Sequence, residues 1–324
     1  MTPIPTPRRL QVVIAFALVY IFWGSTYLAI RLSVEHLTPL IMGALRFTAA
    51  GLLMLAFRAL CGHRIAVPLR DLLRLGVIGF LLLVSANVVM GWAEIYIPTG
   101  LAALLIAVTP LWFLILERIS HSTDHLSRRG LTGISLGVAG VALLLWPDLT
   151  GHTAFGARQL FGSILVLCSS VSWAVGSICS RRWHMPIDPL TASGWQMLIA
   201  GLVCAALALA AGDLHRATWA ASSLWAVVYL IFAGSLIGFT AYVWLLKNVP
   251  IAKVATYAYV NPIVALILGC AFHGEKMDAY MFAGSAVIIL SVILVTGAKV
   301  EHHHPANSQQ EESLDFEPIE PSAD

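Results

Sequence analysis

The chain has 324 residues, of which 59% are hydrophobic and only 11% are charged, and its formal net charge is +2. A soluble domain carries about a quarter charged residues, so this composition excludes an ordinary soluble fold. The five cysteines are scattered without metal-type or paired spacing, which argues against a zinc site or a disulfide framework. No cofactor is expected.

Ten apolar stretches follow one another along the chain, each near the ~20 residues that cross ~30 Å of hydrocarbon. They cover residues 11–30, 39–57, 73–92, 99–117, 130–146, 160–180, 190–211, 223–245, 253–272 and 280–298. The first stretch follows Arg8 and Arg9 but lacks a convincing small-residue cleavage site, so we expect an uncleaved helix. Because the connections are short, the predicted fold is an all-α integral membrane protein with ten transmembrane helices.

The second half of the chain repeats the first at an offset of about 150 residues. Trp23 aligns with Trp173, and Arg46 aligns with Gln196. Further along, three residues align with a residue of the same type: Trp92 with Trp244, Pro98 with Pro250, and Pro110 with Pro262. Five helices per half is an odd number, so the repeats at 11–147 and 160–298 must be inverted. Two inverted repeats around a central cavity are typical of secondary transporters, whose site lies where the repeats meet.

The basic residues indicate the orientation of the chain in the membrane. With the N-terminus in the cytoplasm, 14 of the 19 Lys and Arg residues lie on the cytoplasmic side, four lie outside, and Arg46 lies within a helix. Because basic residues resist translocation, we expect both termini to be cytoplasmic. Residues 1–10 then form a cytoplasmic N-terminus, and the acidic segment 299–324 is expected to be a disordered cytoplasmic tail.

Arg46 is the most informative polar residue. It lies well inside the stretch 39–57, where an arginine is costly unless it is paired or hydrated. In one interpretation it faces the cavity and binds a substrate carboxylate through two parallel hydrogen bonds. In the other it clamps helix-end carbonyl groups or snorkels toward the interface. Both interpretations stay open, and the polar Gln196 at the equivalent position favours a buried polar network in either case.

Aromatic and amide side chains are the next candidates for the cavity. Trp23, Trp92, Trp173 and Trp244 form two repeat-related pairs. They could wall a site for an apolar or aromatic substrate, including an organic cation, although simple helix packing explains them as well. Asn87, in the middle of the stretch 73–92, adds a polar side chain that needs a partner.

Two prolines lie near the middle of their helices, Pro110 after Thr109 and Pro262 after Asn261. Because proline removes a helical hydrogen bond, we expect bends at mirrored points. Such bends could be pivots for alternating access or static kinks.

The stretch 130–146 carries a face of small residues, formed by Gly130, Gly133, Gly137 and Gly140. Small residues let helices approach closely. The pattern predicts tight packing between 130–146 and 280–298, either within the monomer or across a homodimer.

The energy source is constrained by what the sequence lacks. It contains no Gly-Lys dipeptide, which excludes a Walker-type phosphate loop and direct use of ATP. Transport must then be secondary or passive, and proton coupling would need a titratable group on the path. Glu94, beside Trp92, is the candidate proton site, although a solvated helix-end glutamate explains it equally well.

Three short motifs are informative together: Phe22-Trp23-Gly24-Ser25-Thr26, Leu45-Arg46-Phe47 and Tyr96-Ile97-Pro98-Thr99-Gly100-Leu101-Ala102-Ala103-Leu104. They resemble the drug/metabolite transporter superfamily, and more narrowly its ten-helix bacterial exporters of the EamA type. The resemblance spans roughly residues 10–298. It implies a bacterial inner-membrane protein that moves amino acids, their derivatives, or amphipathic amines and drugs outward around a central cavity.

The sequence therefore predicts a secondary transporter rather than an enzyme, exporting a small metabolite or an amphipathic drug by alternating access. An importer is the main alternative, and a membrane-embedded enzyme or a scaffold is less favoured because the histidines are dispersed. The expected partners are the lipid bilayer and a small-molecule substrate, with no nucleic acid. The predicted translocation path comprises Trp23, Tyr27, Arg46, Asn87, Trp92, Thr109, Trp173, Gln196, Trp244 and Asn261.

Overall fold

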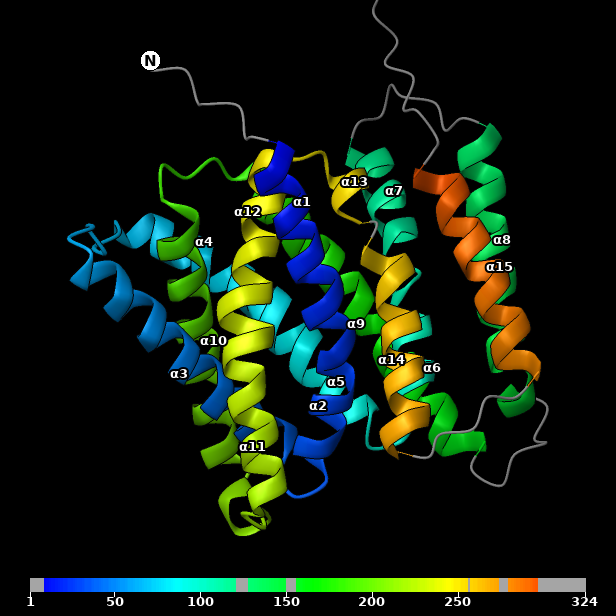
Figure 1. Ribbon diagram of the computed structural model, residues 1–324, viewed down its shortest axis with the longest axis horizontal. Coiled ribbons are helices and arrows are strands. Elements are labelled where there is room, and N and C mark those ends of the chain that lie inside the picture. Colours follow the sequence, from blue (N-terminus) through cyan, green and yellow to red (C-terminus); the bar gives the residue numbers. More distant parts are fainter. Residues whose placement is uncertain (1–8, 121–127, 150–155, 256, 274–278, 297–324) are drawn as a thin grey trace, which may run out of the picture.

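The computed structural model describes residues 9–120, 128–149, 156–255, 257–273 and 279–296, and these form helices joined by turns (Figure 1). The segment 299–324, for which disorder is expected, lies outside the described residues, as do residues 1–8.

The helices of the first repeat follow the predicted apolar stretches in order, some as runs of consecutive segments. They are α1 (Arg9–Leu18), η1 (Val19–Trp23), α2 (Gly24–Val34), α3 (Pro39–Leu60), α4 (Leu69–Gly79), η2 (Phe80–Val88), α5 (Val89–Ala93), α6 (Thr99–Ile106), α7 (Thr109–Ser120) and α8 (Arg128–Leu149). The segments η1 and η2 are π-helical and continue the helices on either side of them.

The second repeat has the same plan. Its elements are α9 (Gly156–Arg182), α10 (Pro189–Ala210), η3 (Asp213–His215), α11 (Ala221–Tyr229), η4 (Leu230–Phe239), α12 (Thr240–Asn248), α13 (Ile251–Val254), α14 (Tyr257–His273) and α15 (Ala279–Thr296). The segment η4 is π-helical, whereas η3 is a short 3₁₀ turn.

Matching start signals begin the second helix of each repeat. Pro39 opens α3 after Thr38, whose side chain accepts a hydrogen bond from the Ile41 nitrogen at 3.3 Å. Asp188 caps α10 in the same way, by accepting from the Thr191 nitrogen at 3.0 Å. A polar cap followed by proline in the first turn satisfies the free N–H groups of a helix start, so local sequence fixes where both helices begin.

Seven helical stretches within the described residues are long and apolar enough to cross a membrane. They are Arg9–Val34, Pro39–Leu60, Leu69–Ala93, Thr99–Leu116, Gly156–Arg182, Pro189–Ala210 and Ala221–Asn248, and shorter apolar helices cover Val260–Gly269 and Ala279–Ser291. The all-α membrane fold and its two-repeat organisation are confirmed, whereas the count of ten spans stays a prediction.

The close contact between α3 and α10 shows how the repeats are related. A Cβ atom at Gly51 would lie 2.5 Å from the Leu198 nitrogen, and one at Gly201 would lie 2.3 Å from the Thr48 nitrogen. Since Thr48 and Gly51 are the repeat partners of Leu198 and Gly201, the two contacts mirror each other. A pseudo-two-fold axis therefore passes through this helix crossing.

The pair formed by α8 and α15 obeys the same symmetry at the opposite side of the molecule (Figure 1). A Cβ atom at Gly137 would lie 2.8 Å from Ser291 Oγ, and one at Gly140 would lie 2.7 Å from Ile288 Cγ1. The Ser291 hydroxyl also donates to the Gly133 carbonyl at 2.6 Å. This glycine face is thus used inside the monomer, and a homodimer through α8 and α15 stays a prediction.

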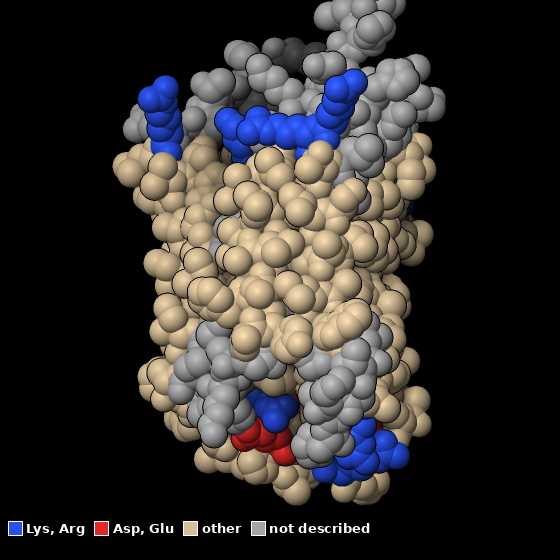
Figure 2. Space-filling model, turned by 90° about the vertical axis from the view of Figure 1, so that its right-hand side faces the viewer, with Lys and Arg blue, Asp and Glu red and all other residues tan. Residues whose placement is uncertain are grey.

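Charged side chains are distributed as a membrane requires. On the face shown in Figure 2, the Lys, Arg, Asp and Glu side chains lie near the two ends of the molecule, and an uncharged belt separates them. The mirrored contacts place the pseudo-two-fold axis through the α3–α10 pair and the α8–α15 pair, which lie at opposite sides of the bundle (Figure 1). Such an axis runs across the direction of the helices, so the two repeats cross this belt in opposite senses.

Candidate translocation site

A central cavity of about 70 Å³ lies between the repeats. It has room for only a few water molecules, so the surrounding side chains must move before a metabolite can occupy it. Its lining comes from both repeats and comprises Trp23, Thr26, Tyr27, Ile30, Arg46, Leu83, Ala86, Asn87, Met90, Ile106, Ser169, Trp173, Gly234, Phe239, Tyr257 and Asn261.

Each of the three π-helical segments faces this cavity. Trp23 belongs to η1, Asn87 belongs to η2, and Gly234 belongs to η4. A π-helical turn accommodates an extra residue and changes the direction of the following side chains, and such turns are frequent at functional sites. The irregular backbone therefore coincides with the cavity.

The Arg46 guanidinium is buried in the cavity wall, with only 3% of the residue exposed. Its Nε donates to Ser235 Oγ at 2.9 Å, its Nη1 donates to Asn87 Oδ1 at 3.1 Å, and its Cζ lies 4.8 Å from the centroid of the Phe47 ring. Among the described residues, no carboxylate forms an ion pair with it. A guanidinium has five N–H donors, so these neutral partners leave donors for an incoming anion.

Gly234 makes room for this guanidinium. A Cβ atom at Gly234 would lie 2.7 Å from Arg46 Nη2 and 2.9 Å from Thr26 Cγ2. The Gly234 carbonyl also accepts a hydrogen bond from Trp23 Nε1 at 3.1 Å. The backbone of η4 thus positions both the cation and one aromatic wall.

An aromatic cluster lies on the pseudo-two-fold axis. The repeat partners Trp23 and Trp173 meet edge to face, with ring centroids 5.3 Å apart. Tyr242 contacts both tryptophans, and Tyr257 contacts Trp23. Trp173 Nε1 donates to the Tyr242 hydroxyl at 3.0 Å. Because the tryptophan N–H groups are engaged within the protein, what these rings offer a ligand is apolar and aromatic surface.

Asn261 supplies a second polar group. It is 2% exposed, and its Oδ1 has no hydrogen-bond partner within the part of the chain that the structure describes. A buried acceptor without a donor is costly, so this oxygen is suited to a ligand N–H group or to water.

Glu94 lies in the turn between α5 and α6 and is wholly buried. Its backbone carbonyl accepts a hydrogen bond from the Arg31 guanidinium, and its carboxylate lies within electrostatic range of Tyr27 in the cavity wall. The interpretation of Glu94 as a solvated helix-end glutamate is wrong, because no part of the residue reaches solvent.

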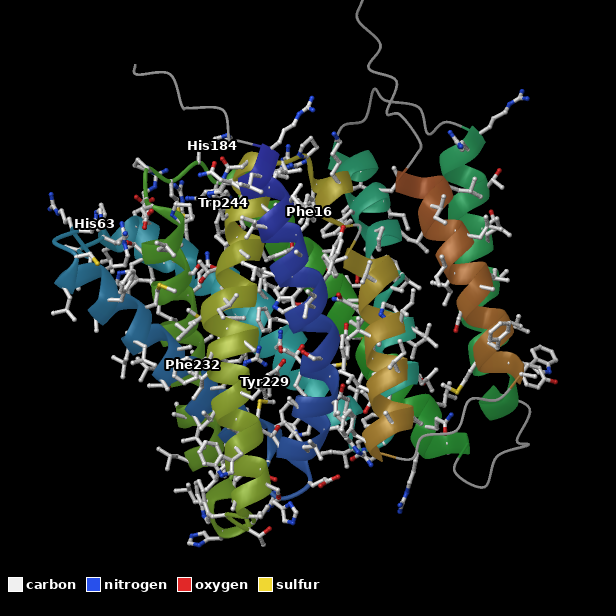
Figure 3. All side chains as sticks on the ribbon, in the orientation of Figure 1. Phe16, His63, His184, Tyr229, Phe232 and Trp244 are labelled. Carbon is white, nitrogen blue, oxygen red and sulfur yellow. The ribbon has the colours of Figure 1, made fainter. Side chains whose placement is uncertain are left out.

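Four residues of the predicted path lie outside the central cavity. Trp92 is 36% exposed and lines a separate groove with Tyr96, and the Thr109 hydroxyl bonds to the Ile106 carbonyl at 2.6 Å. Gln196 is buried in α10 beside Gly79. Trp244 lies near the end of the molecule at which α1 begins (Figure 3).

The symmetry gives the physical reason for this difference. A two-fold axis brings repeat partners together only where they lie close to it, as Trp23 and Trp173 do. Repeat partners that lie far from the axis, such as Trp92 and Trp244, are instead found at opposite ends of the molecule. The expectation that both tryptophan pairs share one cavity is therefore corrected to a single pair.

The two prolines lie differently within their helices. Pro110 lies in the first turn of α7, directly after the break that separates α6 from α7. Pro262 lies inside α14, which runs from Tyr257 to His273. Bends at mirrored points of the two repeats therefore stay a prediction.

Sequence reasoning missed Ser235, Gly234, Tyr242 and Tyr257. The adjacent small residues Gly234 and Ser235, in the middle of an apolar stretch, were a signal of close approach by another group. The two tyrosines belong to no repeat-related pair of aromatic residues, so the repeat did not single them out.

Comparisons with known proteins agree with this architecture. The EamA-like transporter family matches residues 10–146 and 160–297, one match for each repeat. The chain is 40% identical to an uncharacterised inner membrane transporter of Escherichia coli (strain K12), YedA, over 88% of this chain and 90% of the relative. It is 27% identical to a probable amino-acid metabolite efflux pump of Salmonella typhimurium, over 86% of this chain and 92% of the relative.

One solved crystal structure has the same fold. It superposes with a TM-score of 0.65 at 20% identity, covering 89% of this chain and 97% of the other. With a family match over both repeats and a relative at 40% identity, the chain belongs to the EamA-like transporter family and is a multi-pass inner-membrane transporter, not an enzyme.

Proposed function

We propose that this protein is a secondary exporter of small zwitterionic metabolites, namely amino acids or their derivatives. The observation that carries the proposal is the buried Arg46 guanidinium, which has only neutral hydrogen-bond partners in an aromatic-walled cavity. The similarity to a protein named as a probable amino-acid metabolite efflux pump supports it.

The cavity offers a complementary group for each part of such a substrate. A carboxylate meets the free edge of the Arg46 guanidinium, where a two-pronged pair of hydrogen bonds can form. An ammonium group can donate to Asn261 Oδ1, and an apolar or aromatic side chain can pack on Trp23 and Trp173. An amphipathic amine without a carboxylate would bring a second cation beside Arg46, so this class is the less favoured candidate.

Transport then proceeds by alternating access between the inverted repeats. Their two-fold relation lets each half adopt the conformation of the other, which exchanges the open side of the cavity. The proposed orientation places both termini in the cytoplasm, supported by the bias of basic residues. Glu94, buried near Tyr27, is the proposed proton carrier that couples export to a pH gradient.

Flux through purified protein in lipid vesicles tests the proposal, with amino acids, their decarboxylated amines and an imposed pH gradient. Arg46→Lys should weaken transport of amino acids roughly tenfold or more, because an ammonium cannot reproduce the fork. Arg46→Gln should be worse for amino acids and harmless for amines.

Parallel loss for both substrates, in step with the amount of folded protein, would leave Arg46 as a scaffold and refute the assignment. Vesicles with a known protein orientation also separate export from import. Outward flux is the expected direction, and flux only inward would favour the importer.

A further inference from the structure

A second cavity, of about 610 Å³, lies at the end of the molecule where α3 finishes and α10 begins. We call it the Arg58 groove. Its polar lining consists of Arg58, His63, Arg64, Asp71, Asp188 and Thr191. His63 marks its place at the outer edge of the bundle in Figure 3. The groove is separate from the central cavity and shares no lining residue with it.

Both acidic side chains of the groove are already engaged. Asp188 pairs with Arg58 at 3.1 Å and caps α10 at the same time. Asp71 pairs with Arg74 at 3.3 Å, one turn along α4. The pair between Arg58 and Asp188 joins the first repeat to the second.

The basic side chains of the groove, in contrast, have N–H groups that are not engaged in hydrogen bonds with any described part of the chain. Arg58 is 8% exposed, and its buried Nε has no hydrogen-bond partner among the described residues. In the same part of the chain, the side chains of Arg64 and His63 form no hydrogen bond or ion pair. A groove with free donors and engaged carboxylates recognises an anion, and guanidinium groups suit a phosphate in particular.

The apolar surroundings select the kind of anion. Val67, Pro68 and Ile187 wall the groove. Two flanking helices present exposed apolar side chains here, because α3 ends at Leu60, which is 88% exposed, and α4 begins at Leu69, which is 70% exposed. In a membrane such side chains contact acyl chains, so the groove places phosphate-binding donors next to a lipid-facing surface.

We propose that the Arg58 groove binds an anionic phospholipid of the leaflet on this side. The phosphate meets the side chains of Arg58, Arg64 and His63, and the acyl chains lie along Leu60 and Leu69. Basic pockets between transmembrane helices are known sites for such headgroups. Because the groove is built from both repeats, the bound lipid ties them together at this end of the molecule.

The symmetry supplies a matched control. A groove of about 420 Å³ occupies the opposite end of the same helix pair, where α3 begins and α10 ends. There Arg216 pairs with Asp213 at 3.5 Å, and Glu35 also lines the space. His36 lines it too, but its Nδ1 shares a hydrogen bond with Ser223 Oγ at 3.2 Å. With two acids and one arginine, this groove is not expected to bind an anion.

Native mass spectrometry of the delipidated full-length protein tests the proposal, with phosphatidylglycerol, phosphatidylcholine and glycerol phosphate as probes. We expect one phosphatidylglycerol to bind at least tenfold more tightly than phosphatidylcholine. The exposed double variant Arg64→Gln with His63→Gln, which keeps the pair between Arg58 and Asp188, should lose about tenfold in that affinity. Arg216→Gln should bind as the unmodified protein does.

Three results would overturn the proposal. The first is equal binding of the two lipids, and the second is unchanged phosphatidylglycerol affinity in the double variant. The third is glycerol phosphate binding as tightly as the lipid, which would assign the groove to a soluble phosphate ester instead. The Tm of each variant, measured without lipid, verifies that every lipid affinity is compared between folded proteins.

Discussion

Gly234→Ala tests how the cavity positions its cation. The added Cβ atom would lie 2.7 Å from Arg46 Nη2 and 2.9 Å from Thr26 Cγ2. The nearest atom is the far end of a long side chain, so the guanidinium can give way and the protein can still fold. In moving, it must leave the geometry of its bonds to Ser235 and Asn87.

The structure sets the size of the effect. A hydrogen bond to a charged group contributes about 1.5–3 kcal/mol, which corresponds to roughly 10- to 100-fold in affinity for a carboxylate that depends on the displaced guanidinium. Alanine is also favoured over glycine inside a helix by about 1 kcal/mol. Thus folding should be maintained while binding of the carboxylate falls.

Gly76→Ala is the matched control, because a Cβ atom there would lie 3.5 Å from Ile199 Cγ2, an ordinary contact. The assay is vesicle flux per folded molecule for an amino acid and its decarboxylated amine. Gly234→Ala should lose amino-acid flux and keep amine flux, and Gly76→Ala should keep both. Equal behaviour of the two variants, or an equal loss for both substrates, would refute the assigned geometry.

Three further predictions concern packing, coupling and topology. Gly201→Ala should destabilise the protein by about 1–3 kcal/mol, seen as a lower Tm, because its Cβ would meet the Thr48 nitrogen at 2.3 Å; an unchanged Tm would contradict the close helix crossing. Glu94→Gln should abolish acceleration of export by a pH gradient and spare substrate binding, whereas unaltered gradient dependence would remove Glu94 as the proton carrier. In a cysteine-free background, an impermeant thiol reagent should label Arg216→Cys in intact cells and Arg64→Cys only after permeabilisation, and equal access would disprove the orientation.

The architecture was predictable because the membrane imposes strong rules on the sequence. Apolar stretches of fixed length and the offset between Trp23 and Trp173 are enough to indicate helices and inverted repeats. Arg46 was singled out for the same reason, since a cation inside an apolar helix needs a partner. Its surroundings then decide the role, and they became visible only when Asn87 and Ser235 were brought together by the fold.

The remainder of the site could not be read from the chain for two physical reasons. Repeat partners converge only near the symmetry axis, so alignment could not separate Trp173, which lies on it, from Trp244, which does not. Glycine has no side chain and so lets another group lie against the backbone, but nothing in the sequence indicates that at Gly234 this group is the Arg46 guanidinium. The π-helical segments also change the direction of side chains without a distinctive local sequence.

The central claim is that the Arg46 guanidinium binds a substrate carboxylate, and a binding cycle tests it most directly. Calorimetry would compare phenylalanine with phenethylamine, which lacks only the carboxylate, on the purified protein and on Arg46→Gln. The account predicts that the unmodified protein prefers phenylalanine by roughly tenfold or more and that Arg46→Gln abolishes the preference. The same preference in both proteins, or a preference for the amine in the unmodified one, would contradict it.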